Sequence, residues 1–156
     1  MEIYRVSFIG HREVEDFSFV EEQLQKVVAD LISSKEYVEF YVGRNGEFDI
    51  LVASVIKRAK RDIGDCNSAL ILVLPYSIAN EKDYEKFYDE IWYPQELYGV
   101  HFKSAITKRN EWFVENSDLL VAYVVRDYGG AAQCLKKAIR RGIEIKRVDK
   151  GSVVQD

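Results

Sequence analysis

The stretch Leu119-Leu120-Val121-Ala122-Tyr123-Val124-Val125, followed by Tyr128-Gly129-Gly130-Ala131-Ala132-Gln133, decides the fold of this chain. A continuous apolar run of this length is typical of a strand buried on both faces, and residues 135–141 then show the pattern of a helix. A strand, a double glycine and a helix start in this order place free backbone N–H groups and the positive end of a helix at one point. The stretch therefore predicts a turn that binds a phosphate.

The beginning of the chain repeats this arrangement, because the apolar strand at residues 4–9 ends in Gly10-His11-Arg12. Outward from these two points, apolar spacing and turn residues predict further strands at residues 37–42, 69–74 and 143–148 and a short one at 91–93. Helices are expected from Ser18, with Glu21 completing a capping box, from Phe48 to Gly64, over residues 81–90, from Ser104, and up to Gly142.

The alternation of strands and helices predicts an α/β fold. We expect a Rossmann-like, doubly wound, mostly parallel sheet of about five to six strands flanked by helices, in one domain spanning residues 1–150 with a flexible tail at 151–156. Ligands of such sheets bind at the carboxyl ends of the strands, where the strand order reverses. If the first and fifth strands are neighbours at that point, their two glycine turns face one crevice.

Composition limits the classes of function. The chain has 156 residues, 47% of them hydrophobic, and a formal net charge of −4, which argues against nucleic acid as a partner. No apolar run approaches the ~18 residues of a membrane span, and Glu2 and Arg5 interrupt any signal-peptide core. Cys66 and Cys134 form no CxxC pair and are expected as reduced thiols of a cytoplasmic protein. No metal-ligand cluster is visible, so we expect no metal and no required cofactor.

Four ordered motifs between residues 8 and 138 resemble those of the YpsA-like branch of the SLOG superfamily. Phe8-Ile9-Gly10-His11-Arg12 is similar to the opening GHR motif, and the Gly-x-x-Gly-x-Phe-Asp pattern of residues 43–49 is similar to the second motif. Arg109-Asn110 followed by Asn116-Ser117-Asp118 resembles the third, and Gly129-Gly130 followed by Ala138 resembles the last.

The resemblance implies a Rossmann-like fold that binds nucleotides or nucleotide-derived molecules. Relatives include the Lonely Guy phosphoribohydrolases, which release a base from a nucleoside monophosphate, and DprA, which binds single-stranded DNA. The chain departs from the hydrolase motif PGGxGTxxE, because Tyr128 replaces its proline, Ala132-Gln133 replaces Gly-Thr and Lys136 falls on its glutamate. Ala131 also stands where YpsA-like proteins have a threonine.

The candidate site follows from these motifs. Glycine turns and Arg12 are expected to hold phosphate, and Arg109 adds positive charge. Asp49 is a candidate for a ribose hydroxyl or a general base, and His11 for a base or ribose contact or a general acid. Phe48 is expected either to stack on a base or to pack in the core. The predicted ligand-binding set is Gly10, His11, Arg12, Gly43, Gly46, Phe48, Asp49, Arg109, Asn110, Gly129, Gly130, Ala131 and Gln133; Asp49 and His11 are the catalytic candidates.

The leading hypothesis is therefore a module that senses or sequesters a nucleotide-type small molecule. The alternative is a hydrolase that cleaves an N-glycosidic or phosphate bond of a nucleotide, and a less favoured one is single-stranded DNA binding by analogy with DprA. The aromatic segment 84–98 is expected to pack in the core, to cover the pocket or to form the face of a homodimer.

Overall fold

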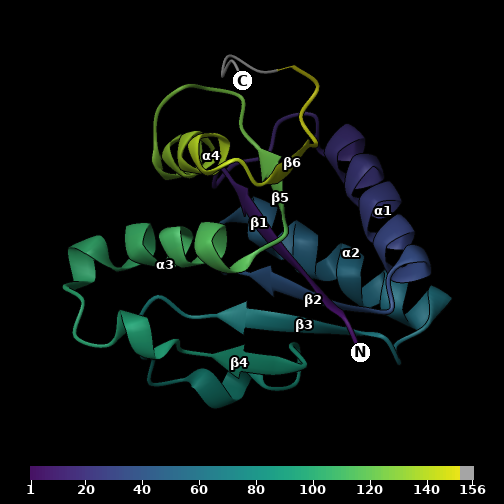
Figure 1. Ribbon diagram of the computed structural model, residues 1–156, viewed down its shortest axis with the longest axis horizontal. Helices are drawn as coiled ribbons and strands as arrows, with labels where there is room; N and C mark the ends of the chain where they lie inside the picture. The colour runs from purple at the N-terminus through teal and green to yellow at the C-terminus, as the bar shows by residue number, and fades with distance from the viewer. Residues whose placement is uncertain (152–156) are drawn as a thin grey trace.

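The computed structural model describes residues 1–151, and within them six parallel strands form one sheet in the order β4-β3-β2-β1-β5-β6 (Figure 1). The last residues of the expected tail, 152–156, lie outside the described part. The strands are β1 Ile3–Gly10, β2 Tyr37–Val42, β3 Ser68–Val73, β4 Glu90–Trp92, β5 Leu119–Tyr123 and β6 Glu144–Arg147. The helices are α1 Phe17–Ser34, α2 Glu47–Ile63, α3 Phe102–Asn116 and α4 Gly130–Arg141, with 3₁₀ turns η1 Glu81–Tyr84 and η2 Gln95–Leu97. The predicted Rossmann-like α/β fold is confirmed.

Strand β1 lies at the point where the strand order reverses. It pairs with β2 on one side and with β5 on the other, and Gly10 is in register with Tyr123. The two predicted turns, at the ends of β1 and β5, therefore leave the sheet side by side.

Two hydrophobic cores form because side chains alternate between the faces of the sheet. Phe8 and Phe40 point into the core shared with α1 and α2, whereas Ile9 and Tyr41 point into the core shared with α3 and α4. Each strand of the sheet centre is thus covered on both faces, which explains its continuous apolar sequence.

Several predicted boundaries were wrong. Ser18 is not a cap: α1 begins one residue earlier, and Asp16, in a left-handed conformation with φ 53°, occupies the cap position without a side-chain bond. The cap of α3 is His101, whose Nδ1 accepts a hydrogen bond from Lys103 N at 3.2 Å, and not Ser104. Of the helix expected at residues 81–90 only the turn η1 forms. Among residues 1–151 no helix is long and apolar enough to cross a membrane.

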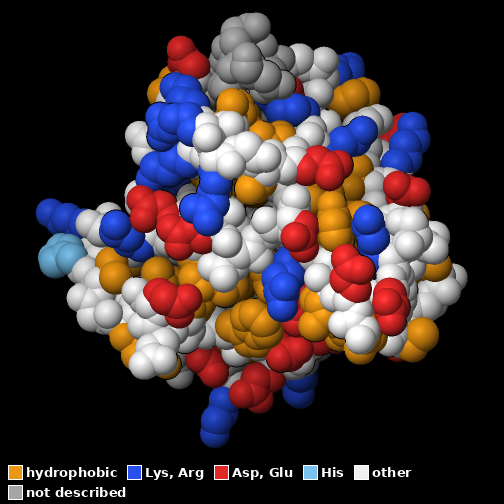
Figure 2. Space-filling model, viewed as in Figure 1, with side chains coloured by type: hydrophobic (Ala, Val, Ile, Leu, Met, Phe, Trp, Pro, Cys, Tyr) orange, Lys and Arg blue, Asp and Glu red, His pale blue; other side chains and the backbone are white. Residues whose placement is uncertain are grey.

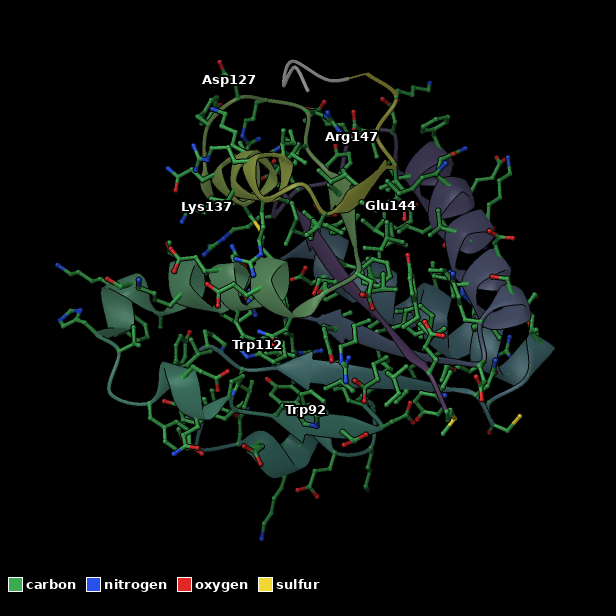
Figure 3. All side chains as sticks on the ribbon, in the orientation of Figure 1. Trp92, Trp112, Asp127, Lys137, Glu144 and Arg147 are labelled. Carbon is green, nitrogen blue, oxygen red and sulfur yellow. The ribbon has the colours of Figure 1, made fainter. Side chains whose placement is uncertain are left out.

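The aromatic segment 84–98 does not form one surface. Trp92 points from β4 toward Trp112 of α3 (Figure 3), with ring centroids 6.3 Å apart, and also contacts Tyr41. Tyr88 is buried on the opposite face of the sheet, and Phe87 is exposed. Core packing therefore accounts for part of the segment, while the homodimer stays a prediction.

Gly10 ends β1 where the sheet meets α2. A Cβ at this position would lie 2.4 Å from the ring of Phe48. Phe48 is fully buried and stacks on Tyr123, with centroids 5.7 Å apart and an interplanar angle of 18°. Only glycine leaves room for this stack, so α2 packs directly onto the end of β1.

We expect Gly10→Ala to destabilise the protein by about 1–3 kcal/mol, because the added methyl group overpacks the contact with Phe48. Urea denaturation gives the free energy of unfolding. The matched control is Gly130→Ala, where a Cβ meets nothing within 4 Å, and there we expect no loss of stability. Equal stability of the two variants would contradict the packing role of Gly10.

Candidate functional site

A pocket of about 280 Å³ opens at the carboxyl ends of β1 and β5. It is lined by the end of β1, by the loop before α2, by one face of α3 and by the first turn of α4. This is the crevice at the switch point that the sequence predicts. Its lining residues are Phe8, Ile9, Gly10, His11, Arg12, Asn45, Asp49, Ile106, Arg109, Asn110, Arg126, Gly129, Gly130 and Ala131.

Arg126 lines the pocket and has a buried side-chain nitrogen without a hydrogen-bond partner. Its Nε is buried and has no hydrogen-bond partner, and it is the one such side-chain atom in residues 1–151. The guanidinium carbon lies 5.1 Å from the ring centre of Tyr128, which holds the group in place. An unpaired buried donor is costly, and an anion in the pocket is the group that would satisfy it.

The N-terminus of α4 adds free backbone donors beside Arg126. Gly129 precedes the helix with φ 94°, a conformation that favours glycine, and no side chain caps the helix. Gly130 and Ala131, in the first turn of α4, line the pocket. The amide groups and the helix dipole both favour a negative charge at this point.

His11 is buried and bonded to the backbone. Its Nε2 accepts a hydrogen bond from Val125 N at 3.0 Å, which ties the end of β1 to the exit of β5. Its ring packs edge-on against Tyr123. Burial, and then the charge of Arg126, lower the pKa of His11 below 6.5, so the imidazole is neutral at pH 7.

Asp49 and Arg109 form a buried pair of opposite charges behind the pocket. Asp49 Oδ2 accepts a hydrogen bond from Asn45 N at 2.8 Å. Arg109 Nη1 donates to Val73 O at 3.0 Å, and its Nε donates to Asn110 Oδ1 at 3.1 Å. Burial raises the pKa of Asp49, and the positive charge of Arg109 opposes this rise.

Two motif glycines are explained by close packing against charged residues of the pocket. A Cβ on Gly43 would lie 2.7 Å from Arg109 Nη1 and 3.0 Å from Asp49 Oδ2. A Cβ on Gly46 would lie 2.5 Å from Arg12 Cα. Neither glycine lines the pocket; both let the charged residues that do so approach the backbone.

Arg12 is an exposed residue of the pocket wall. Within residues 1–151 its side chain makes no hydrogen bond or ion pair, and its backbone O accepts from Glu47 N at 2.7 Å. The backbone is therefore fixed while the guanidinium is free to reach a ligand. Together with Arg109 and Arg126 it gives the pocket three cations against the one carboxylate of Asp49.

The structure brings together nine of the predicted site residues, which all line the pocket: Gly10, His11, Arg12, Asp49, Arg109, Asn110, Gly129, Gly130 and Ala131. Gln133 is exposed on α4 and does not line it. Phe48 has no exposed surface, so its ring packs in the core, the second of the two predicted roles, and offers no face to a base.

The sequence reasoning missed Arg126, Asn45 and Ile106. Arg126 carried a signal, because it is the one cation between the apolar strand and the double glycine, at the carboxyl end of β5. Asn45 donates its backbone N–H to Asp49 Oδ2, and Ile106 lies one turn before Arg109 on α3. Residue type alone does not indicate that either residue lines the pocket.

The described residues contain no cluster of side chains that could bind a metal ion. Residues 1–151 contain no group of three or more His, Cys, Asp or Glu side chains that could hold an ion. Cys134 is buried, its thiol contacts Asn110 O at 3.7 Å, and burial raises its pKa to about 12. Cys66 is exposed, and neither cysteine forms a disulfide.

Comparison with known proteins gives the fold but no family. No family model matches the chain, and no curated protein matches its sequence. Among solved structures, DNA processing protein A (DprA) from Streptococcus pneumoniae superimposes with a TM-score of 0.68 at 13% identity, over 98% of this chain and 52% of that one. DprA from Helicobacter pylori, described with its mode of single-stranded DNA binding, gives 0.64 at 14% identity, over 92% and 64%. The chain thus has the Rossmann-like fold of DprA and spans about half to two-thirds of these proteins.

His11 should titrate below pH 6.5, and inorganic phosphate should raise its pKa, because a bound anion offsets the charge of Arg126. Two-dimensional NMR of the imidazole carbons measures the pKa of His11 without and with phosphate. The chain has two histidines, so the variant His101→Ala assigns the signals of His11. Because the folded pKa is lowered, the stability that neutral His11 provides is present above pH 6.5 and is lost as the pH falls. A midpoint at or above 6.5 would contradict this assignment.

Proposed function

We propose that the pocket binds the phosphate of a nucleotide or nucleotide-derived small molecule, and that the chain is a binding module of the YpsA-like type. The unpaired buried Nε of Arg126 carries the proposal, because Arg126 lines a pocket that also contains the first residues of α4. A phosphate oxygen satisfies both kinds of donor at once.

The other charged residues of the pocket contact different parts of the ligand. The exposed side chain of Arg12 binds the phosphate from the solvent side. The buried side chain of Arg109 adds a positive charge in the wall of the pocket. The carboxylate of Asp49 is the acceptor available for a ribose hydroxyl. Arg109 keeps its own proton despite its burial, because arginine remains charged in proteins.

The size of the pocket favours a phosphate and a sugar inside and a base at the rim. At about 280 Å³ it lies just below the range of pockets that enclose whole drug-sized ligands. Exposed aromatic rings occur near the pocket. Tyr128 is 66% exposed in the loop before Gly129. Phe102, at the start of α3, is 68% exposed, lies one turn before Ile106 and packs on Tyr76 with ring centroids 4.8 Å apart. A base can stack on the exposed ring of Phe102, or on the face of Tyr128 that the guanidinium of Arg126 leaves open.

A thermal-shift panel of nucleoside mono-, di- and triphosphates, ADP-ribose, NAD and cyclic nucleotides tests the proposal. A ligand at ~100 times its Kd adds roughly 2.7 kcal/mol of stability, which raises Tm by several degrees. We expect Arg126→Gln and Arg12→Ala to lose most of the shift. Lysines and arginines gather over α4 (Figure 2), and Arg140→Ala in that group is the matched control that should keep it.

The thermal-shift panel can support or reject the proposed binding site. A shift in Tm that Arg126→Gln removes and Arg140→Ala keeps supports nucleotide binding in the pocket. No shift with any small nucleotide rejects it. Chromatography of the stabilising nucleotide after incubation shows whether a base or phosphate is released. The hydrolase stays a prediction, since His11 Nε2 and Asp49 Oδ2 already accept backbone N–H groups.

Single-stranded DNA is a second candidate ligand, favoured by the exposed rings of Tyr128 and Phe102 and by the likeness to DprA. The net charge of −4 argues against it, but the three pocket arginines make the local surface positive. A phosphate pocket with stacking rings beside it suits one nucleotide of a strand as well as a free nucleotide.

For this candidate we expect a labelled oligodeoxythymidylate to bind with an affinity that falls steeply between 50 and 200 mM salt. Fluorescence anisotropy measures it, with Phe102→Ala and Arg126→Gln as weakened variants and Arg140→Ala as control. Binding that is weak at low salt, or equal in Phe102→Ala, would leave the small nucleotide as the ligand.

A further inference from the structure

A second concavity, distinct from the phosphate pocket, lies between the outer face of α2 and the segment that leads into β4. Its volume is about 550 Å³. Its floor is apolar, and four cations and one serine stand around it. The apolar residues are Ile50, Ala53, Phe87 and Tyr88, and the polar ones are Arg44, Ser54, Lys57, Arg58 and Arg61. The groove begins at Arg44, next to Asn45 of the phosphate pocket, but the two share no lining residue.

The floor of this groove exposes large apolar side chains. Ile50 is 52% and Phe87 56% exposed. Positions 50, 53, 54, 57 and 61 recur at helical spacing, so they form one continuous stripe on α2. Helix α1 meets the edge of this groove at Arg58, another lining residue, which pairs with Glu21 at 2.8 Å, whereas Ile50 and Phe87 keep more than half of their surface exposed.

Two of the cations are held by aromatic rings instead of carboxylates. Arg44 lies 4.5 Å above the ring of Tyr84 and donates from Nη1 to Tyr88 Oη at 3.2 Å. Lys57 Nζ lies 4.7 Å above the ring of Phe87. Within residues 1–151 neither makes an ion pair, whereas Arg61 in the same groove pairs with Asp62 at 3.0 Å. The groove thus presents oriented, uncompensated positive charge.

We propose that this groove binds an acidic segment of a partner protein that carries one or two large apolar side chains. The apolar side chains fill the floor between Ile50 and Phe87, and flanking carboxylates meet Arg44 and Lys57. From Ile50 to Arg61 the stripe is about 17 Å long at 1.5 Å per residue, which matches three turns of helix or five extended residues.

Nucleic acid fits the groove less well. The ammonium group of Lys57 occupies one face of the Phe87 ring, which limits the stacking of a base. Tyr88, the second aromatic residue of the lining, is only 4% exposed, and the aliphatic Ile50 favours apolar side chains over bases. The partner is therefore assigned as a peptide segment, and nucleic acid becomes an outcome of the test.

Selection from a displayed library of random 12-residue peptides on the whole protein tests the proposal. We expect enriched sequences to combine Asp or Glu with Leu, Ile, Phe or Trp. A synthetic peptide of the most enriched sequence should bind at least tenfold more weakly to Lys57→Glu and to Phe87→Ala. Both residues are exposed, so the variants should fold, which urea denaturation checks. Arg140→Glu, an equal change of charge on α4, should bind like the wild type.

The proposal is overturned if the selected peptides are neutral or basic, if no sequence is enriched, or if Lys57→Glu binds the peptide as well as the wild type does. An oligodeoxythymidylate that binds the wild type and is lost in Lys57→Glu would make the groove a nucleic-acid site instead. Nucleotide thermal shifts should be unchanged in Lys57→Glu, so failure here is separate from failure of the phosphate pocket.

Discussion

The burial of Arg109 is the constraint on which the functional edge of the sheet depends. A guanidinium that is 3% exposed costs several kcal/mol unless its donors and its charge are met by the protein. The carbonyl of Val73 at the end of β3, the Asn110 side chain and the ring of Phe113, 4.8 Å away, meet the donors and the cation. Asp49 supplies the opposite charge, so three separate elements are fixed around one side chain.

The contacts of Arg109 also fix the positions of α2 and α3 at the pocket. With Arg109 held at the end of β3, the rotation of α3 is set, and Ile106 one turn earlier faces the pocket. Because Asp49 is drawn into the same cluster, α2 must begin close to β1, and its Phe48 then occupies the space that a side chain at position 10 would need. The glycines at 10 and 43 are consequences of buried charge and packing as much as of ligand approach.

The sequence predicted what depends on periodicity and failed where tertiary contacts decide. The alternation of apolar runs and helical spacing was enough for the sheet and for the neighbouring exits of β1 and β5. Cap positions were missed for two reasons. Asp16 is of a type that is common at N-caps but adopts a left-handed conformation without a side-chain bond, and His101 caps through its ring nitrogen, which residue type does not reveal. Arg126 was overlooked although its position before the double glycine was a signal, because the missing partner of its Nε depends on tertiary structure. The burial of Phe48 likewise depends on how α2 packs against Gly10.

The pairing of β1 with β5 joins segments that are far apart in the sequence. Arg5 N donates to Asp118 Oδ2 at 2.9 Å and Asp118 N donates to Arg5 O at 2.8 Å, across 113 positions of sequence. A growing chain can lay β2 and β3 beside β1 early, but the second edge of β1 stays open until β5 has been synthesised. The pocket at the carboxyl ends of β1 and β5 does not exist before that pairing forms. Its walls therefore depend on contacts between segments that lie more than 100 positions apart in the sequence.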